Sequence, residues 1–232
     1  MTSLSLDLHR RLNRIPGLVP LLVKPLRIYR AWVGPRKLRK ELESNPRRRI
    51  VIGASGVYEE GWIPTGIDSL NILDPADWER FFKVGSIDAM LAEHVWEHLT
   101  LAEGQKAARN CYRYLRPGGY LRVAVPDGFH PSARYIEAVR VGGNGLGADD
   151  HKVLYNYETL SQIFEKEGFR VTLLEYFDES NEFHYAEWSP ADGKIWRSSR
   201  FDERNQNGML NYTSLVLDAV KEGGSETSNL AA

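Results

Sequence analysis

The chain has 232 residues, of which 42% are hydrophobic and 26% are charged, and its net charge at pH 7 is −1. This composition is typical of a globular domain and excludes collagen, a coiled-coil rod and low-complexity disorder. The single cysteine, Cys111, excludes a disulfide framework and a thiolate metal cluster, so we expect a cytoplasmic protein. No apolar run is long enough to span a bilayer, and residues 1–20 lack the order of a signal peptide.

Basic residues gather near the N-terminus. Residues 1–49 contain 13 lysines and arginines and 3 acidic residues, whereas the rest of the chain is acidic overall. We therefore predict a basic N-terminal extension over residues 1–45. Two interpretations stay open: the extension neutralises the acidic domain, or it makes a peripheral contact with an anionic membrane surface. The acidic remainder argues against nucleic acid as a partner.

Apolar strands and amphipathic helices alternate from residue 46 onward. We expect strands over 47–56, 62–69, 86–94, 120–127, 170–178 and 209–221, and helices over 74–82, 100–116 and 157–169. Asp74 can cap the first helix ahead of Pro75, which suits the first helical position. Thr100 and Glu103 form a capping box, which predicts where the second helix begins.

This alternation predicts one α/β domain over residues 46–222, with a Rossmann-like, doubly wound and mostly parallel sheet. We expect an inserted hairpin at about residues 179–208 and a disordered tail over residues 223–232. In such a sheet, ligands bind beyond the carboxyl ends of the strands, near the point where the strand order reverses. The residues that end the predicted strands are therefore the first candidates for a site.

Two features after the first two strands favour a bound nucleoside. Gly53-Ala54-Ser55-Gly56 follows the first strand, and glycine there lets the backbone approach a ligand closely. Asp68 ends the second strand, where a carboxylate can accept hydrogen bonds from both ribose hydroxyls. The loop departs from the G-x-G-x-x-G pattern that cradles a pyrophosphate. A cofactor without a pyrophosphate, such as S-adenosylmethionine (SAM), does not need that pattern.

A longer set of motifs lies within residues 86–127. The set comprises Glu93-His94-Val95-Trp96-Glu97-His98-Leu99, then Leu115-Arg116-Pro117-Gly118-Gly119, then Val125-Pro126-Asp127. This ordered set resembles the class I SAM-dependent methyltransferases. The resemblance extends over about residues 47–221. It implies a seven-stranded sheet whose last strand is antiparallel, with SAM bound above the first and fourth strands.

The strand-end positions and this resemblance together give the candidate cofactor residues, namely Gly53, Ala54, Ser55, Gly56, Asp68, Asp74, Glu93 and His94. For Glu93 and His94 a purely structural role stays open. Asp74 or Asp77, with Trp78, stands in for the acid that contacts adenine in the family.

Methyl transfer from a sulfonium needs an aligned nucleophile, and an oxygen nucleophile also benefits from a base. Our first choice of base is His151, because a glycine-rich loop that can close over substrate delivers it. His94 and His130 are the other candidates. We expect O-methylation of a small or glycan-like metabolite. Before the last strand, arginine forks favour carboxylate or phosphate groups and tryptophan faces favour sugars. Alternatively, Asp202 and Glu203 pair with these arginines in a hairpin without a binding role. The candidate substrate contacts are Asp127, Asp150, Lys152, Arg197 and Arg200.

Other interpretations are weighed against this one. Glu97 and His98 belong to a Glu-His-x-x-Glu-His run that lacks the His-Glu-x-x-His order of zinc enzymes, so we expect structural roles for both and no metal site. A non-catalytic binding module with the same fold is an alternative function. An NAD-type oxidoreductase is a weaker alternative, because the glycine fingerprint is incomplete and no Tyr-x-x-x-Lys pair is evident. Neither the oligomeric state nor the methyl acceptor follows from the sequence.

Overall fold

The structure, a computed structural model, describes residues 33–54 and 59–223. Most of the predicted basic extension and of the predicted tail lies outside these residues, as do Ser55 and Gly56. The strands are β1 (Arg49–Ile52), β2 (Ile63–Pro64), β3 (Ile87–Glu93), β4 (Leu115–Pro126), β5 (Arg170–Phe177), β6 (Phe183–Tyr185) and β7 (Ser214–Val220). The helices are α3 (Pro75–Phe81), α4 (Leu101–Tyr114), α5 (Ala133–Val139) and α6 (Tyr157–Glu165), with 3₁₀ helices η1 (Trp96–His98), η2 (Ala148–Asp150) and η3 (Pro190–Asp192).

Within the described residues, the strands form one seven-stranded sheet in the order β2-β1-β3-β4-β7-β5-β6. The first four strands of this order are parallel neighbours, whereas β7 runs antiparallel to both β4 and β5. β6 is a short edge strand that pairs antiparallel with β5. The predicted α/β class, the Rossmann-like sheet and the antiparallel last strand are confirmed.

The second strand is shorter than expected. The sequence predicts a strand over residues 62–69, but only Ile63–Pro64 has strand geometry. The chain then turns over Gly66, whose carbonyl accepts two backbone N–H groups from further along the chain. Asp68 lies in this turn, four residues after the end of β2.

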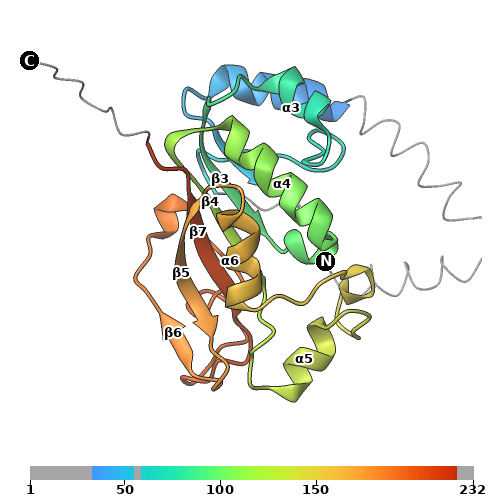
Figure 1. The fold of residues 1–232 in the computed structure, drawn as a ribbon, viewed down its shortest axis with the longest axis vertical. Coiled ribbons are helices and arrows are strands. Elements are labelled where there is room, and N and C mark those ends of the chain that lie inside the picture. The colour runs from blue at the N-terminus through green and yellow to red at the C-terminus, as the bar shows by residue number, and fades with distance from the viewer. Residues whose placement is uncertain (1–32, 55–58, 224–232) are drawn as a thin grey trace, which may run out of the picture.

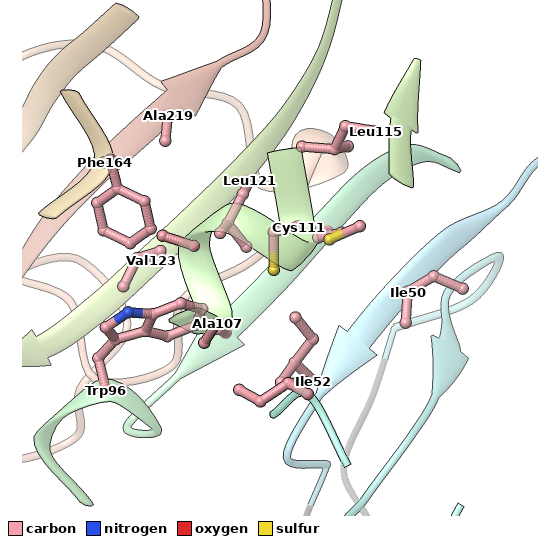
Figure 2. Packing of buried hydrophobic residues seen from close by; sticks show 14 of the residues in the cluster. Ile50, Ile52, Trp96, Ala107, Cys111, Leu115, Leu121, Val123, Phe164 and Ala219 are labelled. Atoms are coloured by element: carbon pink, nitrogen blue, oxygen red, sulfur yellow. The ribbon is translucent and has the colours of Figure 1, made fainter. Parts of the chain in front are cut away.

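Helices cover one face of the sheet (Figure 1). α4 begins at a capping box: the Thr100 hydroxyl accepts the N–H of Glu103, and the Glu103 carboxylate accepts the N–H of Thr100. Between the helices and the strands, Trp96 of η1, Cys111 of α4 and Phe164 of α6 are completely buried in one apolar cluster (Figure 2). Burying a large apolar side chain stabilises the folded state by roughly 1.5–3 kcal/mol.

Residues 33–44 also belong to this packed face. They form a helix, although the sequence analysis placed them in the N-terminal extension. Leu38 of this helix is 2% exposed and lies in the same core cluster as Trp78 of α3. The folded unit therefore includes residues on the N-terminal side of position 46.

The opposite face of the sheet is covered by residues 186–208, here called the covering segment. Its only helix is the three-residue η3. Trp188 and Ile195 of the covering segment pack on apolar residues that the strands present on this face: Val51, Leu91, Ala124, Leu174 and Val216. A non-helical segment thus shields the second face of the sheet from water.

Two buried charged side chains attach the covering segment to the sheet. Arg122 of β4 is 3% exposed, makes two 2.8 Å hydrogen bonds to the Asp218 carboxylate of β7, and donates to the carbonyls of Ser189 and Gly193. Glu175 of β5 accepts hydrogen bonds from the Trp188 indole and the backbone of Ser199. Charged groups buried with such partners hold the segment in one position, because leaving either unpaired costs several kcal/mol.

Candidate functional site

β1 lies at a topological switch point of the sheet. β2 pairs with one edge of β1, and β3 pairs with the other edge. Ligand crevices in open α/β sheets form at such points, beyond the carboxyl ends of the strands. Two cavities of about 370 and 390 Å³ lie here, and both are lined by Gly53, Glu93 and Arg197. Their sizes fall within the roughly 300–1,000 Å³ range of small-molecule sites.

The two cavities differ in their walls. The cavity of about 370 Å³, here called the sheet cavity, is lined by the ends of β1 and β3 and by Lys194 and Trp196 of the covering segment. The cavity of about 390 Å³, here called the histidine cavity, is lined by His94, His98 and His151 together with the loop before His151. The shared residues make one continuous lining from apolar strand ends to a group of imidazoles.

Gly53 follows β1 with a φ of +70°, a conformation that side chains rarely adopt. A Cβ atom added at Gly53 would also lie 2.6 Å from Cγ2 of Val95. Both the backbone conformation and the close approach therefore require glycine here. Bare backbone at the end of β1 is what a cofactor needs in order to approach the strand closely.

Glu93 joins the end of β3 to the covering segment. Its carboxylate accepts the backbone N–H of Trp196 at 3.2 Å and that of Arg197 at 2.7 Å. The Arg197 carbonyl in turn accepts the N–H of Ser214 at the start of β7, at 2.9 Å. These contacts fix the backbone of Arg197 at the junction of the two cavities.

Lys194 and Trp196 form the outer wall of the sheet cavity. Nζ of Lys194 lies 3.5 Å from the centre of the Trp196 ring and 3.6 Å from Oε1 of Glu59. Trp196 is 42% exposed, which is high for a tryptophan. An aromatic face and a cation at a cavity wall favour planar or anionic groups in a ligand.

His94 directly follows β3 and has an unusual backbone conformation. Its φ is +55°, and its backbone N–H donates to the carbonyl of Ala124 at 2.8 Å. Nε2 of His94 lies 3.0 Å from the Ser214 hydroxyl, and Nδ1 lies 2.9 Å from Oε1 of Glu97. A non-glycine residue held with positive φ costs of order 1–3 kcal/mol and is found most often at functional sites.

Glu97 is the most deeply buried acid beside the histidine cavity, with 1% of its surface exposed. Burial, the largest single influence, raises the pKa of Glu97, but the interactions with His94, its own backbone and His98 together hold the pKa below its usual value. Glu97 is therefore ionised at neutral pH. A buried carboxylate of this kind requires a cationic partner.

His151 and His98 complete this group. Nδ1 of His151 is 2.6 Å from the carbonyl oxygen of Val139, so Nδ1 carries the proton and Nε2 carries the lone pair. The two imidazole rings lie edge to face with their centres 4.9 Å apart. Nδ1 of His98 lies 3.5 Å from Oδ2 of Asp150. Backbone hydrogen bonds from Lys152 and Val153 to the Glu97 carbonyl hold His151 close to η1.

Asp127 lines neither cavity in the described part of the chain. It is completely buried, and its carboxylate accepts the backbone N–H groups of Phe129 and Phe177 at 2.9 and 2.7 Å. Burial raises the pKa of Asp127 to about 6, against the lowering effect of these hydrogen bonds. These contacts join the end of β4 to β5, so the structure places this predicted substrate residue in a packing role.

His130 also lies away from the lining of both cavities. Its ring stacks on Tyr135 with the centres 3.9 Å apart, and Nδ1 accepts the N–H of Ser132 at 3.1 Å. Burial lowers the pKa of His130 to about 4. These contacts organise the chain that leads into α5.

The remaining predicted residues lie around the site or outside it. Asp74 caps α3 by accepting the N–H of Ala76, and neither Asp74 nor Asp68 lines the two cavities. Asp150 pairs with Lys152 at 2.8 Å on the surface beside His98. Arg200 is exposed and lies over the Phe201 ring.

Sequence reasoning missed several lining residues. Its candidate substrate contacts did not include Lys194, Trp196, Arg204 or Tyr212, which line the two cavities. The mixture of aromatic and basic residues before the last strand is the signal that could have identified these residues. Glu97 and His98, expected to be structural, lie on the wall of the histidine cavity.

Comparison with known protein families finds one match. Residues 71–123, from the turn before α3 to β4, match the sequence profile of the methyltransferase domain family. Among curated proteins, none matches the chain. The match covers residues 71–123 only; together with the strand order it indicates a SAM-dependent methyltransferase, and the cofactor of such an enzyme is SAM.

Solved structures with similar folds include a SAM-dependent methyltransferase from Archaeoglobus fulgidus, with 17% identity over 83% of this chain and 94% of that chain and a TM-score of 0.48. A possible histamine N-methyltransferase from Thermotoga maritima has 14% identity over 88% of this chain and 97% of that chain, with a TM-score of 0.45. Phosphoethanolamine N-methyltransferase 2 from Haemonchus contortus, in complex with SAM, has 14% identity over 83% and 53% of the two chains, with a TM-score of 0.43.

The chemistry of the lining fits this cofactor. Gly53 offers bare backbone at the switch point, and Arg197 offers a cation that suits a carboxylate such as that of the methionine moiety. Within the described residues, no helix is both long and apolar enough to cross a membrane.

Proposed function

We propose that this methyltransferase transfers the methyl group of SAM to an oxygen atom of a small or glycan-like metabolite. SAM occupies the sheet cavity at the switch point, and the acceptor occupies the histidine cavity. The observation that carries this proposal is the shared lining of the two cavities by Gly53, Glu93 and Arg197. A site for the methyl donor and a site with imidazole bases therefore adjoin, as an in-line displacement requires.

Gly53, Ala54 and Glu93 are the residues that would hold the cofactor. Gly53 and Ala54 present backbone at the end of β1, and Glu93 orients the covering segment through two backbone N–H groups. When bound, SAM supplies a methyl group already activated by a sulfonium. The protein then contributes alignment of the acceptor and exclusion of water, and alignment alone can supply roughly 7–11 kcal/mol in ideal cases.

His151 is the proposed general base. The hydrogen bond from its Nδ1–H to Val139 fixes the tautomer, so Nε2 is free to accept the proton of an acceptor hydroxyl. Only 7% of the residue is exposed, which limits access of bulk water to that nitrogen. A base in this position contributes roughly 10²–10⁴-fold to the rate.

An anionic or sugar-like acceptor suits the far side of the histidine cavity. Arg197 and Arg204 both line this cavity, and the guanidinium of Arg204 lies 3.4 Å from the centre of the Tyr212 ring. Guanidinium groups match carboxylate and phosphate, and aromatic faces match sugar rings. Because the Asp202 carboxylate already accepts two hydrogen bonds from the Arg204 guanidinium, we place the sugar part of the acceptor against Tyr212 and Arg204 and leave Arg197 to the carboxylate of the cofactor.

The test uses the full chain in two measurements. Calorimetric titration with S-adenosylhomocysteine should show one binding site and no response to NAD. Transfer of labelled methyl from SAM to a panel of hydroxylated acids and sugars should then fall in His151→Gln by about 10²-fold or more while the affinity for S-adenosylhomocysteine stays within a few-fold. His184→Gln, on the edge strand β6, is the matched control. Full turnover in His151→Gln would remove His151 as the base.

A peripheral membrane contact is a separate proposal for the basic N-terminal part. Within the described residues, the helix over 33–44 exposes Arg39 and Lys40, which line a cavity together with Arg80. Clustered cations attract anionic lipid headgroups by about 1 kcal/mol each near the surface. Sedimentation with phosphatidylserine vesicles should therefore fall when Arg39→Glu and Lys40→Glu are combined. Equal sedimentation of the variant and the wild-type chain would contradict the contact.

A further inference from the structure

Three metal-ligating side chains converge on the wall of the histidine cavity. Glu97 and His98 come from η1, and His151 follows η2. One potential ligand atom from each of the three lies within 4.8 Å of the other two. The sequence separation of more than 50 residues between His98 and His151 means that folding of the loop before His151 creates the cluster.

The buried carboxylate of Glu97 is the strongest evidence for a bound cation. Only 1% of its surface is exposed, and within the described residues neither carboxylate oxygen has a hydrogen bond of acceptable geometry. Oε1 lies 2.9 Å from Nδ1 of His94, and Oε2 accepts no hydrogen bond among the described residues. A buried carboxylate with spare acceptor capacity is costly, and a bound cation would compensate it.

The two histidines are oriented as ligands. Nδ1 of His151 donates to the Val139 carbonyl at 2.6 Å, which leaves the lone pair of Nε2 available for coordination. Metal-binding histidines almost always donate their other N–H to a carbonyl or carboxylate in this way. Nδ1 of His98 is buried and has no hydrogen bond of acceptable geometry among the described residues.

We propose that Glu97, His98 and His151 bind one divalent transition-metal ion of the Zn²⁺ type. Two imidazole nitrogens and one carboxylate oxygen form a common three-ligand set for Zn²⁺. Ligand atoms 2.0–2.1 Å from a tetrahedral ion lie about 3.4 Å apart. The three atoms, now within 4.8 Å of one another, therefore need to move by only about 1 Å to reach that spacing. The fourth coordination position faces the histidine cavity, which these residues line. His94, in contact with Glu97, is the outer-shell partner.

A second group of potential ligands provides an internal comparison. Asp178, Glu182 and His184 also come within 4.8 Å of one another. Here the Asp178 carboxylate already contacts Nε2 of His184 at 2.7 Å and accepts the backbone N–H groups of Ser180 and Glu182. This group lies near the surface with its acceptors satisfied, so we expect no tight metal binding there.

The site has a consequence for catalysis that rests on the proposed function. Nε2 of His151 cannot coordinate an ion and accept a proton from an acceptor hydroxyl at the same time. A bound ion should therefore inhibit methyl transfer that uses His151 as the base. Binding of the ion itself does not depend on the proposed function, so failure of one can be distinguished from failure of the other.

The experiment measures metal binding directly on the full-length chain after treatment with a chelator. Zn²⁺ is titrated in competition with a chromophoric chelator, and Co²⁺ is added to report coordination geometry through its visible d–d absorption. We expect one equivalent of either ion to bind. His98→Ala and His151→Ala should each weaken Zn²⁺ binding by more than the roughly 10–100-fold that loss of an outer-shell partner costs, and His94→Gln should fall within that range. His184→Ala should retain wild-type affinity.

The outcomes separate the alternatives. His98 is partly exposed, so His98→Ala is the variant expected to keep the fold, and circular dichroism verifies that it does. Absence of stoichiometric binding in the wild-type chain would overturn the proposal. So would undiminished binding in folded His98→Ala, or a loss of binding in His184→Ala, which would place the ion on β6 and the turn before it.

Discussion

Oε1 of Glu97 lies 2.9 Å from Nδ1 of His94, and this pair joins the end of β3 to the first turn that follows it. The pair is buried, since the side chains are 1% and 10% exposed. His94 reaches Glu97 because its backbone has positive φ, which turns the chain sharply at the carboxyl end of the strand. The pair therefore couples the geometry of the switch point to the wall of the histidine cavity.

Replacing His94 by alanine should destabilise the protein. The substitution leaves the Glu97 carboxylate buried without the imidazole 2.9 Å from it, and removal of one member of a buried pair costs about 3–5 kcal/mol. Urea denaturation of the metal-free chain at pH 7 measures the free energy of unfolding. The double variant His94→Ala/Glu97→Gln should recover part of the loss. If His94→Ala unfolds at the wild-type urea concentration, the pair does not stabilise the fold.

Asp127 should make stability fall as the pH rises from about 4 to 6. Burial raises the pKa of Asp127 in the folded state from 3.8 to about 6, so the folded state binds this proton more tightly than the unfolded chain does. The stabilising contribution is complete below the unfolded value and is lost as the pH passes through the folded value. The stability of the wild-type chain relative to Asp127→Asn should therefore decrease over this interval. A difference that is constant with pH would contradict the raised pKa.

Gly53→Ala should reduce both stability and cofactor affinity. The substitution places a side chain at a φ of +70° and a Cβ 2.6 Å from Cγ2 of Val95, which together cost of order 1–3 kcal/mol. Gly61→Ala is the matched control, because Gly61 has a φ of +79° and no atom near its added Cβ. Calorimetry with S-adenosylhomocysteine and thermal unfolding measure both effects. Equal losses in the two variants would mean that backbone conformation alone is responsible.

Glu93→Gln should loosen the covering segment. The amide retains one acceptor oxygen, so it can accept only one of the N–H groups of Trp196 and Arg197 through a carbonyl. Loss of a hydrogen bond to a charged group costs roughly 1.5–3 kcal/mol. We expect faster amide hydrogen exchange at residues 194–198 and weaker binding of S-adenosylhomocysteine. Glu59→Gln, at the outer wall of the sheet cavity, is the comparison variant, and indistinguishable exchange in the two proteins would contradict this role for Glu93.

Much of the fold follows from local signals in the sequence. The capping box at Thr100 and Glu103 begins α4, and Asp74 with Pro75 begins α3, because each satisfies backbone N–H groups at a helix start. The sequence did not show that residues 186–208 cover one face of the sheet. This segment has no helical or strand period, and its position depends on hydrogen bonds to distant strands through Arg122 and Glu175.

The candidate site follows from the sequence in part. Gly53, Glu93, His94 and Arg197 were expected at the site and do line the cavities, because each is near a strand end or the segment before the last strand. Asp127 also ends a strand, but its side chain turns into the packing between β4 and β5. The position along a strand thus indicates the edge of the sheet, whereas the direction of the side chain depends on its neighbours.

The sequence by itself determined that this protein is an α/β methyltransferase. Strand periodicity, helix caps and the ordered motifs from Glu93 to Asp127 are all local patterns that can be found in short stretches of chain. Only the tertiary structure decided which side chains meet. His151 reaches Glu97 because the backbone of Lys152 and Val153 donates hydrogen bonds to the Glu97 carbonyl. A contact of that kind pairs residues far apart in the chain, and no local pattern records it.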